Sequence, residues 1–290
     1  MDNSIKVFLF HRVSPETDPL WQPMHPARFE QVIRIIQKLY AIIPLEEYLR
    51  GNIVLKKGKK YAAIGFDDGY KDFTKYALPV LQKHDIQSSM YIVTDCANTG
   101  LPPWTYQVDY LFNNSRKTLI KDGVQYRRQN ATVLKNRMKE MPNEKRKELL
   151  VEIMDQLDDV TLPADLMMDW RDIEEAHNAG VEIGSHTSSH PVLSSIDNSS
   201  DLQYEMQSSF DTLKARLDKP PYAISYPNGR YNEKVMDFAV RAGYKAGLAL
   251  HQKTYRTSRD AAFEIPRIEL YQQSMLKTIA RIAGVTDFLK

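Results

Sequence analysis

Cysteine is almost absent from this sequence, in which Cys96 is the only one. A single cysteine cannot form an intramolecular disulfide, and it excludes a metal site built from several thiolates. Long hydrophobic runs are also absent: no stretch approaches the ~18 apolar residues of a membrane-spanning helix, so we expect no transmembrane segment. Neither sign of charge dominates, because 39 Lys and Arg residues stand against 37 Asp and Glu residues. So balanced a charge does not favour nucleic acid or an anionic membrane as a partner.

A secretion signal is missing from the N-terminal stretch MDNSIKVFLFHRVSP. A signal peptide has a basic segment followed by a longer apolar one, whereas this apolar run is short and ends at a histidine and an arginine. The run predicts a first β-strand instead. We therefore expect a cytoplasmic protein, either free or at the inner face of the membrane. The sequence predicts no oligomeric state.

What the sequence does contain is an alternation of apolar, strand-like runs with amphipathic helical segments. Strands that alternate with helices of ten or more residues predict βα units and parallel strand pairing. The helical segment 71–84 contains Pro79, which predicts a kink or two shorter helices. Seven strand-like runs fit a barrel better than an open sheet: residues 5–10, 61–66, 88–94, 181–185, 222–226, 245–250 and 263–270.

The alternation breaks between residues 100 and about 168, where charged residues are more frequent. Within this segment, residues 131–141 and 143–157 have helical patterns. We interpret the chain as one α/β barrel domain, residues 1–290, with a helical insertion at about 100–168. The insertion is expected to cover the mouth of the barrel.

Polar residues follow three of the predicted strands at the point where each strand ends. They are Asp67-Asp68-Gly69, the run from Ser185 to Pro191, and Tyr226-Pro227-Asn228-Gly229. In α/β barrels the reacting groups lie at these carboxyl ends of the strands. Gly69 allows an unusual backbone turn, which lets both aspartate side chains reach one cavity.

His186 and His190 are four residues apart, a spacing that puts two imidazoles on one side of a helical turn. Pro191 disfavours helical backbone at His190, so we expect the pair on a short loop after the strand. Alone, the pair also fits a helix cap or a polar turn, and the aspartate pair alone fits a turn or a helix N-cap. Together, two imidazoles and one carboxylate make the open three-ligand set of catalytic zinc. The second carboxylate is then free to take a proton from water.

On these residues the chain resembles the polysaccharide deacetylase family, the NodB-homology carbohydrate esterases of family 4. The resemblance lies in FDDGY, HTSSH and SYPNGRYN, each at a predicted strand end. It implies a distorted (β/α)7 barrel that removes an N-acetyl group from an amino sugar in a polysaccharide or its precursor. It also implies zinc, with cobalt or nickel as alternatives, bound by Asp68, His186 and His190. Asp67 is then the catalytic base.

The sequence departs from the family pattern at two places. Ser225 stands where many members have an arginine that orients the base. Arg267, near the end of the chain, is expected either to supply this guanidinium or to lie on the surface. The general acid is expected to be His11 in preference to His251, although both also fit ordinary hydrogen-bonded histidines.

Contacts to the sugar are predicted from one amide and three aromatic residues. The backbone N–H of Asn228 is the expected donor to the oxyanion. Tyr226, Trp104 and Tyr70 are expected to offer ring faces to a sugar, and Trp104 fits a core position equally well. The insertion is expected to set which acceptor saccharide binds.

Three other functions remain open at this point. One is a catalytically silent carbohydrate-binding module that keeps the barrel fold, although the presence of both Asp67 and Asp68 argues for catalysis. A related hydrolase would act on another acyl group or on a ureide-type amide. Two histidines and a carboxylate also form the ligand set of iron oxygenases.

Overall fold

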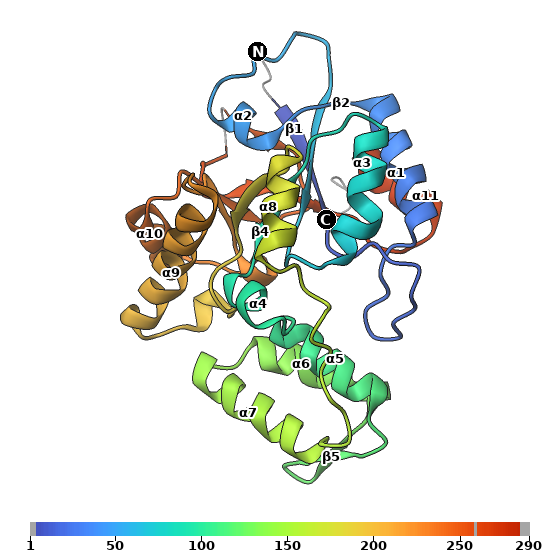
Figure 1. Ribbon diagram of the computed structural model, residues 1–290, viewed down its shortest axis with the longest axis vertical. Helices are drawn as coiled ribbons and strands as arrows, with labels where there is room; N and C mark the ends of the chain where they lie inside the picture. The colour runs from blue at the N-terminus through green and yellow to red at the C-terminus, as the bar shows by residue number, and fades with distance from the viewer. Residues whose placement is uncertain (1–3, 258–259, 285–290) are drawn as a thin grey trace.

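The computed structural model describes residues 4–257 and 260–284, and its centre is a sheet of mostly parallel strands that curves into a nearly closed barrel (Figure 1). Neighbouring strands in the order β1-β3-β4-β7-β8-β9 are all parallel, as βα connections require. Their bounds are β1 Ser4–Phe10, β3 Tyr61–Phe66, β4 Ser89–Ile92, β7 Glu182–Ser185, β8 Ala223–Ser225 and β9 Ala246–Ala249. Two further strands extend the sheet: β2 Ala41–Ile42 and β10 Tyr255–Arg256. The predicted barrel is confirmed.

Two very short strands close the barrel. β11 (Ile265–Pro266) pairs with β9, and β12 (Ile268–Glu269) pairs with β1. The run 263–270, predicted as one strand, therefore changes its neighbour at Arg267, the one residue between the two pairings. The backbone N–H of Arg267 still bonds Ala249 of β9, whereas that of Leu270 bonds Leu9 of β1. Arg267 consequently lies at the seam of the barrel.

Helices cover the outside of the sheet, with α1, α3 and α11 on one flank and α9 and α10 on the other (Figure 1). The segment 71–84 forms two pieces, as Pro79 predicts: a π-helical turn η1 and helix α3, with the proline in the first turn of α3. The helical bounds are α1 Pro26–Leu39, α2 Leu45–Leu49, η1 Phe73–Ala77, α3 Leu78–Lys83, α4 Thr94–Thr99, α8 Trp170–Asn178, η3 Leu193–Ser195, α9 Ser199–Leu217, η4 Pro227–Gly229, α10 Glu233–Ala242 and α11 Met275–Ala283.

The core has two layers because successive residues of a strand point to opposite faces of the sheet. In β1, Ile5 and Val7 pack inside the barrel, whereas Phe8 and Phe10 pack against the outer helices. Both faces are buried, so the strand is apolar throughout, as is usual for parallel sheets. This arrangement holds the strand ends rigidly, and the functional residues follow directly from them.

Between α4 and α8 the chain forms a separate layer, the lobe, which we define as residues 104–156. Figure 1 shows its helices projecting from one end of the barrel. It consists of α5 Trp104–Asn114, β5 Leu119–Lys121, β6 Val124–Tyr126, η2 Arg128–Asn130, α6 Ala131–Lys139 and α7 Asn143–Gln156. The expected insertion is thus not wholly helical. Asp122 and Gly123 both have positive φ and turn the chain between β5 and β6.

The lobe has a hydrophobic cluster of its own, in which Val108, Leu134 and Ile153 bring α5, α6 and α7 together. The limits 100 and 168 of the insertion stay a prediction. Within the described residues, every helix is too short or too polar to cross a membrane.

Candidate active site

The two aspartates after β3 lie side by side in one cavity because the backbone turns sharply there. Asp68 has φ of +75° and Gly69 has φ of +83°. Two consecutive left-handed residues break the strand alternation, which would otherwise send the carboxylates to opposite faces. Asp67 and Asp68 are 2% and 5% exposed. Both line a cavity of about 230 Å³ at the mouth of the barrel.

The two histidines after β7 are held on a loop that is fixed by its own hydroxyl groups. The N–H of Thr187 donates to Ser185 Oγ, and the N–H of His190 donates to Thr187 Oγ1. Thr187 and His190 have positive φ, so the loop is not a helical turn. The expected post-strand loop is present, but left-handed residues bring the imidazoles together where helical spacing was expected to do so.

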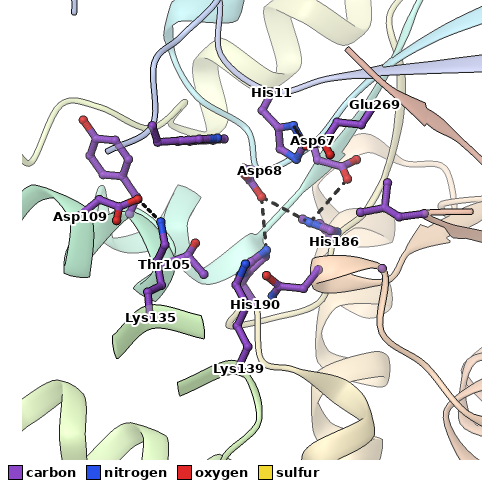
Figure 2. Close-up of a pocket in the computed structure, with 15 residues that line it drawn as sticks. His11, Asp67, Asp68, Thr105, Asp109, Lys135, Lys139, His186, His190 and Glu269 are labelled. Atoms are coloured by element: carbon purple, nitrogen blue, oxygen red, sulfur yellow. Dashed lines mark hydrogen bonds and ion pairs between the residues drawn. The ribbon is translucent and has the colours of Figure 1, made fainter. Parts of the chain in front are cut away.

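Asp68 and the two histidines converge on a single point. Asp68 Oδ1 lies 3.3 Å from His186 Nε2 and 3.4 Å from His190 Nε2 (Figure 2). The three ligand atoms lie within 4.8 Å of one another, and all three residues are buried. Asp68 Oδ1 has no hydrogen-bond partner among the described residues. A buried carboxylate oxygen facing two imidazole nitrogens fits a divalent cation.

Burial, neighbouring charges and one hydrogen bond set the protonation of the groups in this cluster. His186 Nδ1 lies 2.8 Å from the carbonyl oxygen of Ser225, which fixes Nδ1 as a donor and makes Nε2 the nitrogen that faces Asp68. Burial lowers the pKa of His190 to about 3, so its imidazole is neutral. Burial raises the pKa of Asp68, but the neighbouring imidazoles outweigh it and the net pKa is lowered. Burial lowers the pKa of His186, but Asp67 and Asp68 outweigh it and the net pKa is raised, so a cation bound here would take the place of its proton.

Asp67 is paired with a buried arginine. Arg267 Nη1 donates to Asp67 Oδ1 at 2.7 Å, and Nη2 donates to Oδ2 at 2.9 Å. Ser225 Oγ also donates to Asp67 Oδ2, at 3.0 Å, and accepts from Arg267 Nη2 at 2.8 Å. Burial raises the pKa of Asp67, but the charges of Arg267 and then of His186 outweigh burial. The net pKa is lowered, so the carboxylate is ionised. Of the two expected positions for Arg267, the structure has the buried, bidentate one.

The two histidines considered as general acid lie in different places. His11 follows β1 and lines the cavity, with Nδ1 3.6 Å from Glu269 Oε1 and its ring against Trp21. His251 lies outside the cavity lining, and its Nε2 is 2.7 Å from the hydroxyl of Tyr231. Of the two, His11 is the one within the cavity.

The aromatic side chains expected at the sugar are not in this cavity. Tyr226 is fully buried, and its hydroxyl donates to the carbonyl of Phe263. Trp104 packs in the lobe and donates from Nε1 to the carbonyl of His190, 3.0 Å away. Tyr70 is 1% exposed. The expectations for Tyr226 and Tyr70 are corrected here, because rings buried by neighbouring side chains offer no face to a sugar in this cavity. Of the two alternatives for Trp104, the structure has the core position.

Asn228 does line the cavity. Its backbone is left-handed, with φ of +57°, and its side-chain Nδ2 is buried without a hydrogen-bond partner among the described residues. A buried amide donor with no partner is costly, so a ligand that accepts from it would be favoured.

Sequence reasoning missed the other residues of the cavity wall. Trp21 lies in the segment after β1, and the strand-end argument that found His11 could have extended to it. Leu250 directly follows β9, and Glu269 belongs to β12. Five others belong to the lobe, and no motif marks them: Thr105, Tyr106, Asp109, Lys135 and Lys139.

Comparisons with known proteins agree with this geometry. The family model described as polysaccharide deacetylase matches residues 55–247. Among solved structures, the fold is similar to the deacetylase PplD of Streptococcus pyogenes, with a TM-score of 0.64 and 19% identity over 97% of this chain and 99% of that one. It is also similar to IcaB of Ammonifex degensii, with a TM-score of 0.64 and 17% identity over 97% of each chain.

A de-N-acetylase from Aggregatibacter actinomycetemcomitans is similar as well, with a TM-score of 0.61 and 15% identity over 97% of this chain and all of that one. No curated protein matches the sequence. The family match rests on sequence, whereas the solved structures, at these identities, speak for the fold.

Proposed function

Because the chain belongs to the polysaccharide deacetylase family, and is thus a carbohydrate N-deacetylase, we propose a metal-dependent hydrolase that removes an acetyl group from an amino sugar in a polysaccharide or its precursor. The observation that carries this proposal is the pair of neighbouring aspartates in two different environments. Asp68 faces two imidazole nitrogens, whereas Asp67 is held by Arg267. One carboxylate is arranged to bind a cation and the other is left to react.

Asp68, His186 and His190 are the residues that would hold the ion. Two imidazoles and one carboxylate suit zinc best, and cobalt or nickel also accept this set. When bound, such an ion supplies Lewis acidity, which polarises an acyl carbonyl and lowers the pKa of a water molecule.

Asp67 is proposed as the base that accepts the proton of the attacking water. Its carboxylate is ionised, and the fork of Arg267 fixes the plane in which its remaining lone pairs lie. Ser225 adds a third hydrogen bond from the place where other members have an arginine. Arg267 and Ser225 therefore position the base and do not themselves react.

Two other residues of the cavity complete the proposed reaction. His11 is within the cavity, with its Nδ1 3.6 Å from Glu269 Oε1, and is proposed to donate a proton to the leaving amine. Asn228 is proposed to stabilise the oxyanion, through its backbone N–H and its unpartnered Nδ2. Tyr226 and Trp104 have no part in this proposal.

Acetate release from a chitin oligomer of N-acetylglucosamine tests the proposal. The purified chain, supplied with zinc, is expected to release one acetate for each amino group that appears. The matched control is Asp67→Asn, which keeps the size and removes the base. A zinc-loaded chain that binds the oligomer but releases no acetate would point to a silent carbohydrate-binding barrel. Oxygen uptake in the presence of iron would point to an oxygenase instead.

A further inference from the structure

Lys139 is a cation of the catalytic cavity that the proposed reaction does not use. It is the last residue of α6, and its side chain lines the same cavity as Asp67 and Asp68. In Figure 2 it approaches from the side opposite to His11 and Glu269. The lobe thus contributes a positive charge to a cavity whose reacting groups all come from the barrel.

The neighbouring charges of the lobe are already paired, and Lys139 is not. Lys135 forms an ion pair with Asp109, and Glu140 pairs with Arg230. Among the described residues, none forms a hydrogen bond or an ion pair with the ammonium of Lys139. The wall built by α5 and α6 therefore has one positive charge left over, and it faces the cavity.

The surroundings of Lys139 make this ammonium ready to bind an anion. The residue is half-buried, and burial followed by the nearby charge of Lys135 lowers its pKa, although Asp109 and Glu269 act in the opposite direction. A cation that has lost part of its water without gaining a direct ion pair is destabilised, and an anion in contact with it would reduce that cost. A neutral hydroxyl group would not.

We propose that this wall of the cavity is a subsite for an anionic group, a carboxylate or a phosphate, on the saccharide, with Lys139 as its partner. The inference rests on the proposed function and deepens it by naming the substrate class. Because Lys139 belongs to the lobe and Asp67 to a barrel strand end, the anion lies on a different part of the saccharide from the acetyl group. The preferred substrate is thus an acidic saccharide.

The test compares three disaccharides that differ at one carbon atom. Each joins N-acetylglucosamine to a second sugar: glucose, glucuronic acid, or glucose 6-phosphate. The wild-type chain with zinc is expected to have a kcat/KM at least about tenfold higher for an acidic disaccharide than for the neutral one, a ratio that corresponds to about 1.4 kcal/mol. A preference for one acidic disaccharide over the other identifies carboxylate or phosphate as the natural group.

Lys139→Gln is expected to abolish this preference, by lowering kcat/KM for the acidic disaccharides much more than for the neutral one. The matched control is Lys145→Gln, which removes the same charge from an exposed residue of α7 that does not line the cavity. The control should keep the preference. Equal kcat/KM values for all three disaccharides in the wild type would overturn the inference. An equal loss of the preference in Lys139→Gln and Lys145→Gln would overturn it as well.

Binding measured by calorimetry separates this inference from the proposed function. If no disaccharide is hydrolysed, the proposed function fails, and the same three compounds still report on the subsite. Tighter binding of an acidic disaccharide to the wild type than to Lys139→Gln supports the subsite. Equal binding to both chains contradicts it.

Discussion

The barrel mouth and the lobe line the same cavity with charged residues of different kinds. At the barrel mouth Asp67, Asp68 and Arg267 are almost fully buried, and each follows or joins a strand. On the lobe, Lys135 and Lys139 are long side chains of a helix and are partly exposed. Charges fixed by strands suit chemistry, in which atoms must be held to a fraction of an ångström. Charges on flexible stems suit recognition, where several ligand geometries are accepted.

The largest expected effect separates the two aspartates of the barrel mouth. Asp68→Asn should remove the anionic ligand, so we expect both metal retention and acetate release to be lost. Asp67→Asn should retain the metal and lower kcat by about 10²–10⁴, the usual contribution of a general base. Metal content after dialysis, measured beside acetate release, checks the pair. Equal metal loss in both variants would contradict the division of roles.

Next in size is the loss of the buried arginine. Arg267→Gln leaves Asp67 buried without its counter-ion, which should lower the free energy of unfolding by about 3–5 kcal/mol. The matched control is Arg230→Gln, because Arg230 pairs with Glu140 on the surface of the molecule. An exposed pair is worth about 0–1 kcal/mol. Urea unfolding of both variants checks the difference. Similar losses of unfolding free energy would show that the buried pair of Arg267 stabilises the fold no more than the exposed pair of Arg230.

A smaller effect is expected from removal of the metal. At a free zinc concentration about 100 times Kd, binding should stabilise the wild-type chain by about 2.7 kcal/mol. A chelator should abolish this gain. In His186→Ala the melting temperature should be the same with zinc and with chelator, because one ligand is missing. Calorimetric melting curves check this, and a zinc-dependent rise in the variant would place the ion elsewhere.

The smallest effect concerns the contact that joins the lobe to the barrel mouth. Trp104→Phe removes the N–H that donates to the carbonyl of His190. Loss of one neutral hydrogen bond should cost about 1 kcal/mol of unfolding free energy, with kcat/KM changed less than tenfold. Unfolding and kinetics on the same variant check this. A large loss of activity at unchanged stability would indicate that Trp104 contacts the sugar after all.

The barrel mouth could be predicted largely from the sequence because its residues follow apolar strand runs. The alternation of strands and helices predicts the parallel barrel, and Asp67, Asp68, His186 and His190 stand at the ends of two of those strands. Their convergence on one point follows from strand order and left-handed turns. The sequence left the pairing of Arg267 with Asp67 as one of two alternatives. The reason is that 200 positions separate the two residues, which come together only at the barrel seam.

The lobe could be predicted only as a region, because nothing in its pattern fixes how it packs on the barrel. The charge run at 131–141 predicts an amphipathic helix, and Lys139 reads there as one surface lysine among several. Its place in the cavity depends on the packing of α5, α6 and α7 around Val108, Leu134 and Ile153. Tertiary packing also buries Tyr226, which was expected at the sugar, and gives Trp104 the core position that was one of its two alternatives.

The most direct test is an anomalous diffraction experiment at the zinc absorption edge on crystals grown with zinc. The account predicts one strong peak about 2.0–2.2 Å from Asp68 and from Nε2 of both His186 and His190. Asp67 should stay on Arg267, outside the coordination sphere. A peak on other side chains, or one that includes Asp67 in place of Asp68, would contradict the account.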